Sequence, residues 1–553
     1  MRATVVAMAL GLAAAAPPTA PGDPEAAARG AAGLAAIRPR AISARVRFLS
    51  ADLLEGRGTG TRGHGVAELY VATEMQSAGL APGGVDGTYL QPVPLRAWRI
   101  DPAATSLAVQ GPAAPSTWLV RDVDFVMLPD GEHSEVETDA PLAFAGYAVT
   151  APEYGYDDLK GADLRGKVAV ALDGAPLSDR ANFFPPAAHA VYSDRREKLR
   201  RLAAAGAAGV LFVYTPGAEE ALSWDGFARA AQEGMGWLEG GRLGSGVEGV
   251  PTRGVLSMRG FEKLLAIAGI PGGTRAVMEK AEAGRLAPQA WKARVRMRVG
   301  SEMRDARASN VVGVLKGSDP ELAAEWVVVS AHLDDLGIGP PVNGDAIYNG
   351  AMDSASGVAI LLETARAFAA LPVPPRRSVL FLATTGEEKG RLGSEFFARH
   401  PTVPRSRVVA DLDIEGAPTV FPFQDAVARG AEDSSLAGPV ATAAEALGIE
   451  LSPDPFPKAS ALIRSDAYSF VREGIPSVSI SPGVKGGDPE ARERWARERR
   501  HTPRDEWDPS WDWEALARFA RLQFLAGLLI AEAPSRPRWK PGDFLQRFAA
   551  DAP

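Results

Sequence analysis

Two histidines and several carboxylates follow one another along the chain in an order that suits a metal centre. Imidazole nitrogens and carboxylate oxygens, without thiolate, are typical ligands of zinc or a similar divalent ion in a catalytic site that keeps one position open. Each motif is weak by itself, since Asp353, for instance, could simply cap the helix that follows it. Together they predict an oxygen- and imidazole-rich metal site among the side chains of His332, Asp334, Asp335, Asp353, Glu387, Glu388, Asp411, Asp413 and His501.

The composition narrows the chemistry further. The chain has 553 residues and no cysteine, which excludes disulfides, thiolate zinc sites, cysteine nucleophiles and iron–sulfur clusters. There are six histidines, so histidine-dependent chemistry has few possible positions. The net charge of −8 argues against a protein that coats nucleic acid, because such binding relies on Lys and Arg side chains that contact phosphates.

Apolar strands that alternate with helices must position these residues. From about residue 311 to 533 this alternation predicts an α/β sheet with helices on both faces. In that architecture functional side chains gather at the carboxyl edge of the strands. His332, the Glu387-Glu388 doublet and Asp413 each come at the end of a strand, so we expect them to share one cleft. The predicted strands are 326–329, 379–383, 407–412 and 477–481.

The chain divides into three structured regions. We predict an N-terminal part of the catalytic domain at 41–137, an inserted domain at 138–290 and the catalytic domain proper at 300–540. The middle region reads as a β–α–β unit and carries no cluster of metal-ligand types. The glycine-rich segment 55–63 lacks the Lys-Ser/Thr ending of a phosphate-binding loop, so we interpret it as structural.

The amino terminus has the pattern of an export signal. Arg2 precedes a short apolar run, and Ala14 to Ala16 form a small-residue cleavage site, so we predict a signal peptide at 1–20. A Pro- and Ala-rich linker follows at 21–40. No other segment reads as a membrane helix, and the expected location is therefore periplasmic or secreted, without stable membrane insertion.

These motifs resemble peptidase family M28, the dizinc exopeptidases. The family's pattern is met in order by His332-x-Asp334, by Gly350-Ala-x-Asp353-x-Ala-Ser-Gly, by Gly386-Glu-Glu and by the later Asp413 and His501. The resemblance implies a mixed-sheet α/β/α zinc exopeptidase domain, and the middle region resembles the protease-associated domain inserted in some members. What would bind that inserted domain stays open.

The resemblance also implies a role for each residue. Two Zn²⁺ ions, or other divalent metals, would be bound by His332, Asp353, Glu388, Asp413 and His501, with Asp353 bridging both. Glu387 would be the general base, and the Asp334 carboxylate would orient His332. The Asp353–Ser354 peptide bond would be cis.

One departure concerns the group that polarises the substrate carbonyl. Some members place a tyrosine just before the late histidine, where this chain has Arg500. Others place it three residues before a Ser-Asp pair, where this chain has Leu462. Tyr348 and Tyr468 are possible substitutes, so this role stays unassigned.

The expected activity is removal of N-terminal residues from peptide substrates. A carboxypeptidase or dipeptidase on the same scaffold is the alternative. Such an enzyme would need a cationic clamp for the substrate carboxylate. A binding protein that had lost its site is disfavoured, since every ligand position is filled. A single-zinc aminoacyl cyclase would bind one metal per chain. The residues that keep the carboxypeptidase alternative open are Arg464, Arg499, Arg500 and Arg504.

Overall fold

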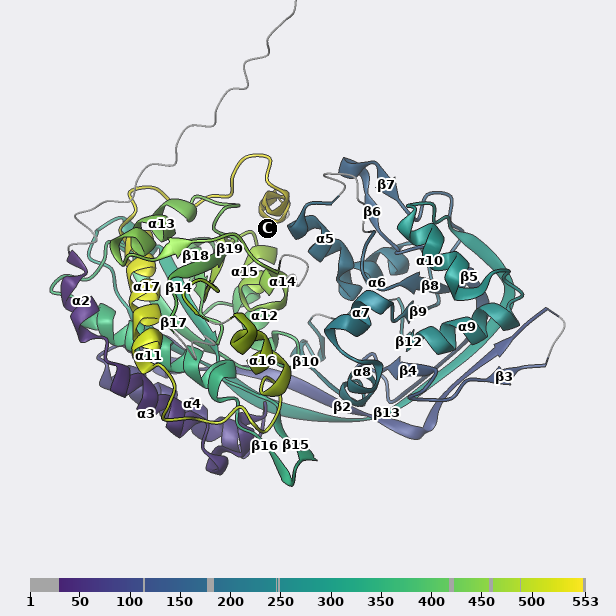
Figure 1. Cartoon of the computed structure of the whole chain (residues 1–553), viewed down its shortest axis with the longest axis horizontal. Helices are drawn as coiled ribbons and strands as arrows, with labels where there is room; N and C mark the ends of the chain where they lie inside the picture. The colour runs from purple at the N-terminus through teal and green to yellow at the C-terminus, as the bar shows by residue number, and fades with distance from the viewer. Residues whose placement is uncertain are drawn as a thin grey trace, which may run out of the picture.

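The computed structural model describes residues 29–550, except 113–114, 177–183, 245, 247–248, 417–421, 457–460 and 488. Figure 1 shows two bodies, a larger α/β body and an inserted unit, joined by two long strands. The predicted export signal at 1–20 lies outside the described residues. In the described part of the chain, no helix combines the length and the apolar character needed to cross a bilayer.

The sheet of the larger body is mixed. Strand β14 (Trp326–His332) lies at its centre between β17 (Ser378–Thr384) and β18 (Val408–Asp413), parallel to both, and β21 (Ser477–Pro482) continues the parallel set. The predicted strands are all present. Antiparallel neighbours close both sides of this set, namely β13 (Gln289–Leu315) beside β17, and β19 (Asp425–Arg429) beside β21, followed by β20 (Glu450–Leu451).

Helices cover both faces of this sheet, as the alternating pattern predicts. Every residue of β17 is buried, which fits a strand covered on two sides. One face packs against a large core formed with α11, and the other against a smaller cluster that includes Phe397 and Phe470. The first face carries α2 (Ala31–Ala36), α3 (Pro39–Leu49), α4 (Arg62–Ser77), α11 (Ser356–Ala369) and α17 (Trp513–Glu532), and the second carries α12 (Leu392–Arg399) and α15 (Ala467–Arg472).

Part of the predicted linker is helical. Within the segment assigned to a linker from its Ala- and Pro-rich composition, residues 31–36 form α2 and residues 39–40 begin α3. Gly33 explains this packing, because a Cβ there would lie 2.2 Å from the ring of Phe524 on α17. A small-residue helix can thus lie directly on α17, and Ala-rich composition favours helix as readily as a flexible linker.

The inserted unit has its own sheet and cores. Its parallel strands are β5 (Glu135–Phe144), β8 (Val168–Leu172), β9 (Gly209–Val213) and β12 (Thr252–Leu256), with β4 (Phe125–Leu128) antiparallel at the end. Its apolar core also includes Leu107 and Met127, which precede the predicted boundary at 138. Its helices are α5 (Pro186–Ser193), α6 (Arg195–Ala204), α7 (Pro216–Ala221), α8 (Trp224–Ala230), α9 (Met258–Ile267) and α10 (Gly273–Glu282).

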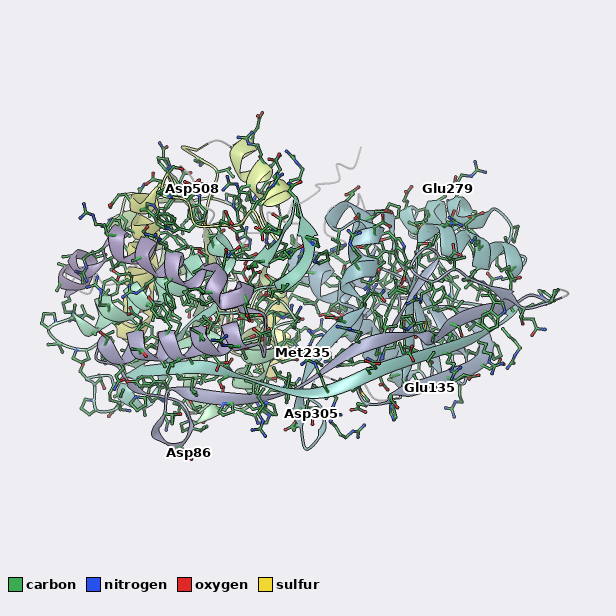
Figure 2. The ribbon with its side chains drawn as sticks, turned by 90° about the horizontal axis from the view of Figure 1, so that it is seen from below. Asp86, Glu135, Met235, Glu279, Asp305 and Asp508 are labelled. Carbon is green, nitrogen blue, oxygen red and sulfur yellow. The ribbon has the colours of Figure 1, made fainter. Side chains whose placement is uncertain are left out.

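Two strands run through both bodies. Strand β2 (Leu90–Gln110) pairs antiparallel with β13 along almost its whole length, from Val311↔Leu90 to Arg294↔Gln110. At one end β13 pairs with β17 of the larger body, and at the other with β5 of the inserted unit. Seen from below in Figure 2, this ladder passes beneath both bodies, near the labelled Asp305 and Met235. The two bodies therefore share one continuous hydrogen-bonded sheet.

Candidate metal centre

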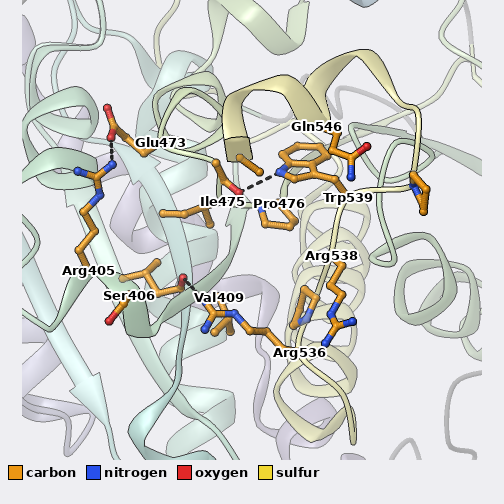
Figure 3. Close-up of a pocket in the computed structure, with 15 residues that line it drawn as sticks. Arg405, Ser406, Val409, Glu473, Ile475, Pro476, Arg536, Arg538, Trp539 and Gln546 are labelled. Carbon is orange, nitrogen blue, oxygen red and sulfur yellow. Dashed lines mark hydrogen bonds and ion pairs between the residues drawn. The ribbon is translucent and has the colours of Figure 1, made fainter. Parts of the chain in front are cut away.

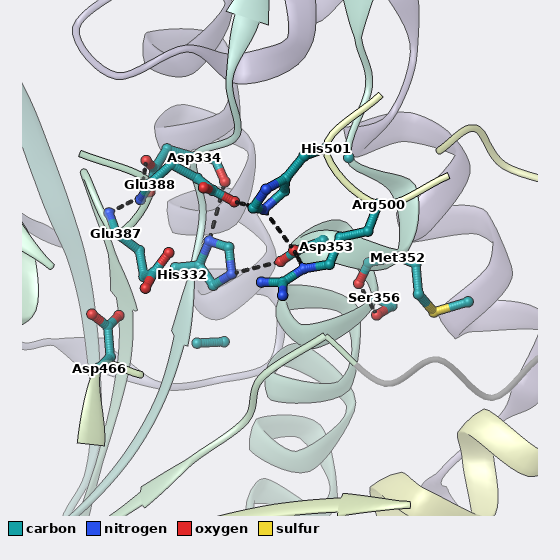
Figure 4. Close-up of polar contacts among 12 residues, drawn as sticks. His332, Asp334, Met352, Asp353, Ser356, Glu387, Glu388, Asp466, Arg500 and His501 are labelled. Atoms are coloured by element: carbon teal, nitrogen blue, oxygen red, sulfur yellow. Dashed lines mark hydrogen bonds and ion pairs between the residues drawn. The ribbon is translucent and has the colours of Figure 1, made fainter. Parts of the chain in front are cut away.

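Four of the predicted site residues converge at the carboxyl edge of the sheet. His332 ends β14, Glu388 follows β17, Asp353 precedes α11, and His501 comes from the segment before α17. Figure 4 shows their side chains directed toward one another. The ligand atoms of Asp353, Glu388 and His501 all lie within 4.8 Å of one another.

Asp353 lies between the two histidines. Its Oδ1 is 3.2 Å from His332 Nε2, and its Oδ2 is 3.3 Å from His501 Nε2. His501 Nε2 also lies 3.1 Å from Glu388 Oε1. One oxygen of the Asp353 carboxylate therefore faces each imidazole, an arrangement that allows this carboxylate to serve two neighbouring positions. The Asp353–Ser354 peptide bond is cis, as predicted.

Asp413 is placed deeper than the other four. It ends β18 and is buried, and Ser330 Oγ lies 3.4 Å from its Oδ1. Burial raises the pKa of the Asp413 carboxyl well above its usual range, with Glu415 the next cause and nearby His332 opposing it. Among the contacts that the structure describes, none joins Asp413 directly to the other four predicted ligands.

The residues present fit a divalent cation. Asp413 Oδ2 is a buried oxygen that accepts no hydrogen bond within the described residues, and Glu388 Oε1, also buried, has His501 Nε2 beside it without a well-directed hydrogen bond. Burying a carboxylate oxygen unpaired is unfavourable, whereas a bound cation would satisfy it. The donor set of two imidazoles and three carboxylates, without sulfur, is one that zinc accepts.

Arg500 contacts the central carboxylate directly. Its Nε donates to Asp353 Oδ2 at 2.7 Å, and its side chain is 41% exposed. Burial alone would raise the pKa of Asp353, but Arg500 and the two histidines outweigh it and hold that pKa well below its usual range. Asp353 is therefore ionised, with a half-exposed guanidinium on the solvent side of the cluster.

The two tyrosines considered for carbonyl polarisation have other surroundings. Tyr348 Oη donates to Pro340 O at 3.0 Å within the hairpin of β15 (Gly337–Val342) and β16 (Asp345–Tyr348). Tyr468 is fully buried beneath the Arg391 guanidinium. The side chain that reaches the cluster is instead Arg500.

Asp334 acts differently from the prediction. The atom that faces His332 Nδ1, at 3.2 Å, is the main-chain oxygen of Asp334 and not its carboxylate. The carboxylate accepts from Glu387 N at 3.0 Å, Glu388 N at 3.3 Å and Thr59 Oγ1 at 2.9 Å. The turn after β14 brings the carbonyl back over the ring, which leaves the carboxylate free to hold the loop that carries the acidic doublet.

Glu387 and Glu388 point in different directions, as consecutive residues after a strand should. Figure 4 shows the Glu388 carboxylate beside His501 and the Glu387 carboxylate on the side of Asp466. Burial raises the pKa of Glu387 well above its usual range; His332 opposes this rise, and Glu388 adds to it. Glu387 is thus a partly buried carboxylate next to the cluster, and it is not among the converging ligand atoms.

Sequence reasoning missed two residues that support the site. Asp505 accepts from Met352 N at 3.0 Å and Asp353 N at 3.1 Å, which holds the backbone of the central ligand. Arg57, in the glycine-rich segment interpreted as structural, is fully buried beneath the site. In the sequence, the only indication for Asp505 is its position four residues after His501. For Arg57 the only indication is a charged residue in a glycine-rich segment.

A large cavity lies elsewhere. It has a volume of about 740 Å³, and it is lined by residues such as Arg405, Glu473 and Trp539 (Figure 3). Arg405 pairs with Glu473, and Trp539 Nε1 donates to Gly474 O at 2.9 Å. None of the predicted site residues lines this cavity, so it is separate from the candidate metal centre.

Fold and site together define an α/β protein with a carboxylate–imidazole metal centre at the carboxyl edge of its sheet. Residues 310–526 match the family model described as peptidase family M28. The match covers about two fifths of the chain and includes every residue of the candidate metal centre.

Three curated relatives are similar over parts of the chain. A probable zinc metalloprotease of Pyricularia oryzae is 43% identical over 94 residues, which is 17% of this chain and 18% of the relative. A probable leucine aminopeptidase 2 of Aspergillus oryzae is 26% identical over 38% of this chain and 39% of the relative. A probable glutamate carboxypeptidase of Arabidopsis thaliana is 34% identical over 25% of this chain and 18% of the relative. The matches thus span less than two fifths of these relatives.

A solved structure supports the fold as a whole. An aminopeptidase from Aneurinibacillus sp. strain AM-1 superposes with a TM-score of 0.50 at 18% identity, covering 93% of this chain and 99% of that chain. At this identity the likeness concerns the fold.

Proposed function

We propose that this chain is a zinc-dependent exopeptidase that hydrolyses N-terminal residues from peptides. The observation that carries the proposal is the convergence of His332, Asp353, Glu388 and His501 at one edge of the sheet, with the partly buried Glu387 beside them. The family match and the similarity to relatives named as zinc metalloprotease and aminopeptidase support it.

The ligand set suggests two ions. Asp353 presents one oxygen to His332 and the other to His501, which also lies beside Glu388. His332 and Asp413 would then hold one Zn²⁺, Glu388 and His501 the other, and Asp353 both. Zinc bound there would supply Lewis-acid polarisation of the scissile carbonyl and a lower pKa for an attacking water.

The chain's own residues then carry the proton. Glu387 takes the proton from the attacking water on its carboxylate and delivers it to the leaving amine. Asp334 holds the main chain of both glutamates through two N–H donors, so that the base keeps its direction relative to the ligand. Burial of Glu387 favours its protonated form and so assists proton uptake.

A carboxypeptidase or dipeptidase is the second candidate, and Arg500 favours it. A half-exposed guanidinium in contact with Asp353 is placed where it could also bind a substrate carboxylate. The similarity to a probable glutamate carboxypeptidase supports the same alternative.

A substrate panel separates the two candidates. Purified protein is assayed with aminoacyl nitroanilides, with N-blocked dipeptides and with C-terminally amidated dipeptides, while zinc is counted in the same preparation. Hydrolysis of nitroanilides and amidated dipeptides supports the aminopeptidase. Hydrolysis that requires a free carboxylate and tolerates an N-terminal block favours the alternative instead.

We also propose that the protein is exported, on the strength of the signal-like pattern at residues 1–20. Expression of the full chain in a bacterial host, followed by cell fractionation and N-terminal sequencing, tests this. A mature protein that begins shortly after Ala16 in the periplasm or medium supports export, and an uncleaved cytoplasmic protein contradicts it.

A further inference from the structure

Arg57 directs its guanidinium at main-chain carbonyl groups. Its Nε donates to Leu333 O at 2.9 Å, its Nη1 to Asn349 O at 2.7 Å, and its Nη2 to Gly350 O at 2.9 Å. Nη1 also donates to Leu49 O at the end of α3. Every hydrogen bond that the structure describes for this guanidinium therefore ends on the backbone.

These carbonyls belong to the two loops that carry the central ligands. Leu333 directly follows His332, and Gly350 lies in the short turn that leads to Asp353. One planar guanidinium thus ties together the backbones on either side of the 3.2 Å contact between His332 and Asp353. The fork of an arginine can reach three carbonyls in fixed directions, which a lysine ammonium on a flexible stem does not reproduce.

The same segment reaches the third loop of the site. Thr59, two residues after Arg57, donates through Oγ1 to Asp334 Oδ2 at 2.9 Å. Asp334 in turn accepts from the main chain of Glu387 and Glu388. The segment from Arg57 to Thr59 therefore contacts the loops of His332 and Asp353 directly. It reaches the loop of Glu388 through Asp334.

Arg57 occupies a position that is unfavourable for stability alone. Its φ of 48° lies in the left-handed region, which side chains rarely adopt. Burying a guanidinium without a hydrogen-bonded carboxylate partner is also unfavourable. The position supplies a fixed cation beneath the acidic groups of the site. The carboxylates with the strongest electrostatic attraction to it are those of Asp335, Asp334, Asp505 and Asp353.

We propose that Arg57 is a positioning residue of the metal centre, which holds the His332 and Asp353 loops at their mutual distance before any metal binds. This inference rests on the proposed zinc site. Its consequence is that loss of the guanidinium lowers zinc affinity, since the ligands must then be ordered at the moment of binding.

The test compares two buried arginines. Arg377 is also fully buried and donates to a backbone carbonyl, that of Ala533, as well as to Glu325 Oε2 at 2.8 Å. It lies just before β17, at the opposite end of the strand from the site. Zinc affinity of metal-free full-length Arg57→Lys and Arg377→Lys proteins is measured by competition with a chromogenic chelator, and thermal unfolding is recorded without metal. We expect both variants to unfold at lower temperature, but only Arg57→Lys to lose about 10–100-fold in zinc affinity.

A milder pair covers the case in which Arg57→Lys does not fold. Thr59→Val removes the hydrogen bond to Asp334, whereas Thr364→Val on α11 removes a buried hydroxyl that has no hydrogen-bond partner within the described residues. Weaker zinc binding by Thr59→Val alone supports the proposal.

The outcomes separate this inference from the proposed function. Wild-type protein that binds zinc while the Arg57 and Thr59 variants bind it equally well overturns the role of Arg57 only. Equal affinity losses in Arg57→Lys and Arg377→Lys would also overturn it, because they indicate a general loss of order. Wild-type protein that binds no zinc overturns both.

Discussion

The Arg500 guanidinium donates through Nε to Asp353 Oδ2, the oxygen that also faces His501, at 2.7 Å. A cation at this position neutralises the carboxylate that the proposed ions would share. It also occupies one of the two oxygens on which those ions depend.

Removing this cation should therefore tighten zinc binding. For Arg500→Gln we expect zinc affinity to rise by about tenfold, the equivalent of roughly 1.4 kcal/mol, because a competitor for Asp353 Oδ2 is lost. Arg504→Gln removes the same charge from the same segment and should leave zinc affinity unchanged. Chelator competition measures both, and weaker zinc binding by Arg500→Gln would contradict the interpretation.

Binding of both zinc ions should depend on Asp353, whereas each histidine should mainly affect the binding of one ion. We expect two zinc ions per wild-type chain, none tightly bound in Asp353→Ala, and about one in His501→Ala or His332→Ala, because Asp353 contacts both histidines. His133→Ala serves as the control, since His133 pairs with Asp130 in the inserted unit. Elemental analysis after gel filtration gives the stoichiometry, and two full equivalents in Asp353→Ala would refute the bridging role.

The two glutamates of the doublet should fail in different ways. Glu387→Gln removes a proton acceptor that is not among the converging ligand atoms, so zinc should stay bound while kcat falls by about 10²–10⁴ with little change in KM. Glu388→Gln should instead lose zinc, because Glu388 Oε1 lies beside His501. Zinc loss in Glu387→Gln together with retention in Glu388→Gln would reverse the assignment.

The acidic pair of Asp433 and Asp543 should make the packing of the C-terminal segment around Asp543 pH-dependent. Burial raises the pKa of Asp433 to about 7, and Asp543 adds to the rise. An acid with a raised pKa in the folded state binds more protons there than in the unfolded state, so stability falls as pH rises from about 4 to about 7. Glu432 acts in the same direction as Asp543, and Lys540 opposes them.

Hydrogen exchange tests this at the segment that Asp543 belongs to. We expect amides around residues 540–546 to exchange faster at pH 8 than at pH 5, after correction for the intrinsic rate. Asp433→Asn should remove most of that difference. An unchanged pH dependence in Asp433→Asn would show that another group is responsible.

Much of the site was predictable because it is encoded in short motifs at strand ends. His332, the acidic doublet and Asp413 each come at the end of a run of apolar residues, and parallel strands bring their carboxyl ends to one edge. The four converging side chains were all named from the sequence. The strands themselves were equally clear, since β14 and β17 are almost entirely apolar and buried.

The rest depends on contacts between distant segments. Arg57 reaches residues nearly three hundred positions away, and nothing local in a glycine-rich stretch predicts those partners. The role of Asp334 turned on which of its oxygens faces His332, a matter of backbone direction that residue type does not specify. The packing of α2 on α17 depends on the close approach of Gly33 to Phe524, which the composition of the segment does not reveal.

The ladder of β2 and β13 limits how independent the inserted unit can be. A domain tethered by two flexible linkers can be exchanged, deleted or rotated at will, but here the crossing consists of paired rungs such as Arg96↔Asp305. Cutting it leaves open edges on both bodies, and unpaired strand edges invite aggregation. Chimaeras with other proteins should therefore be joined at paired positions of this ladder. Relative motion of the two bodies should consist of bending and twisting of the shared strands and not of rotation about a flexible hinge.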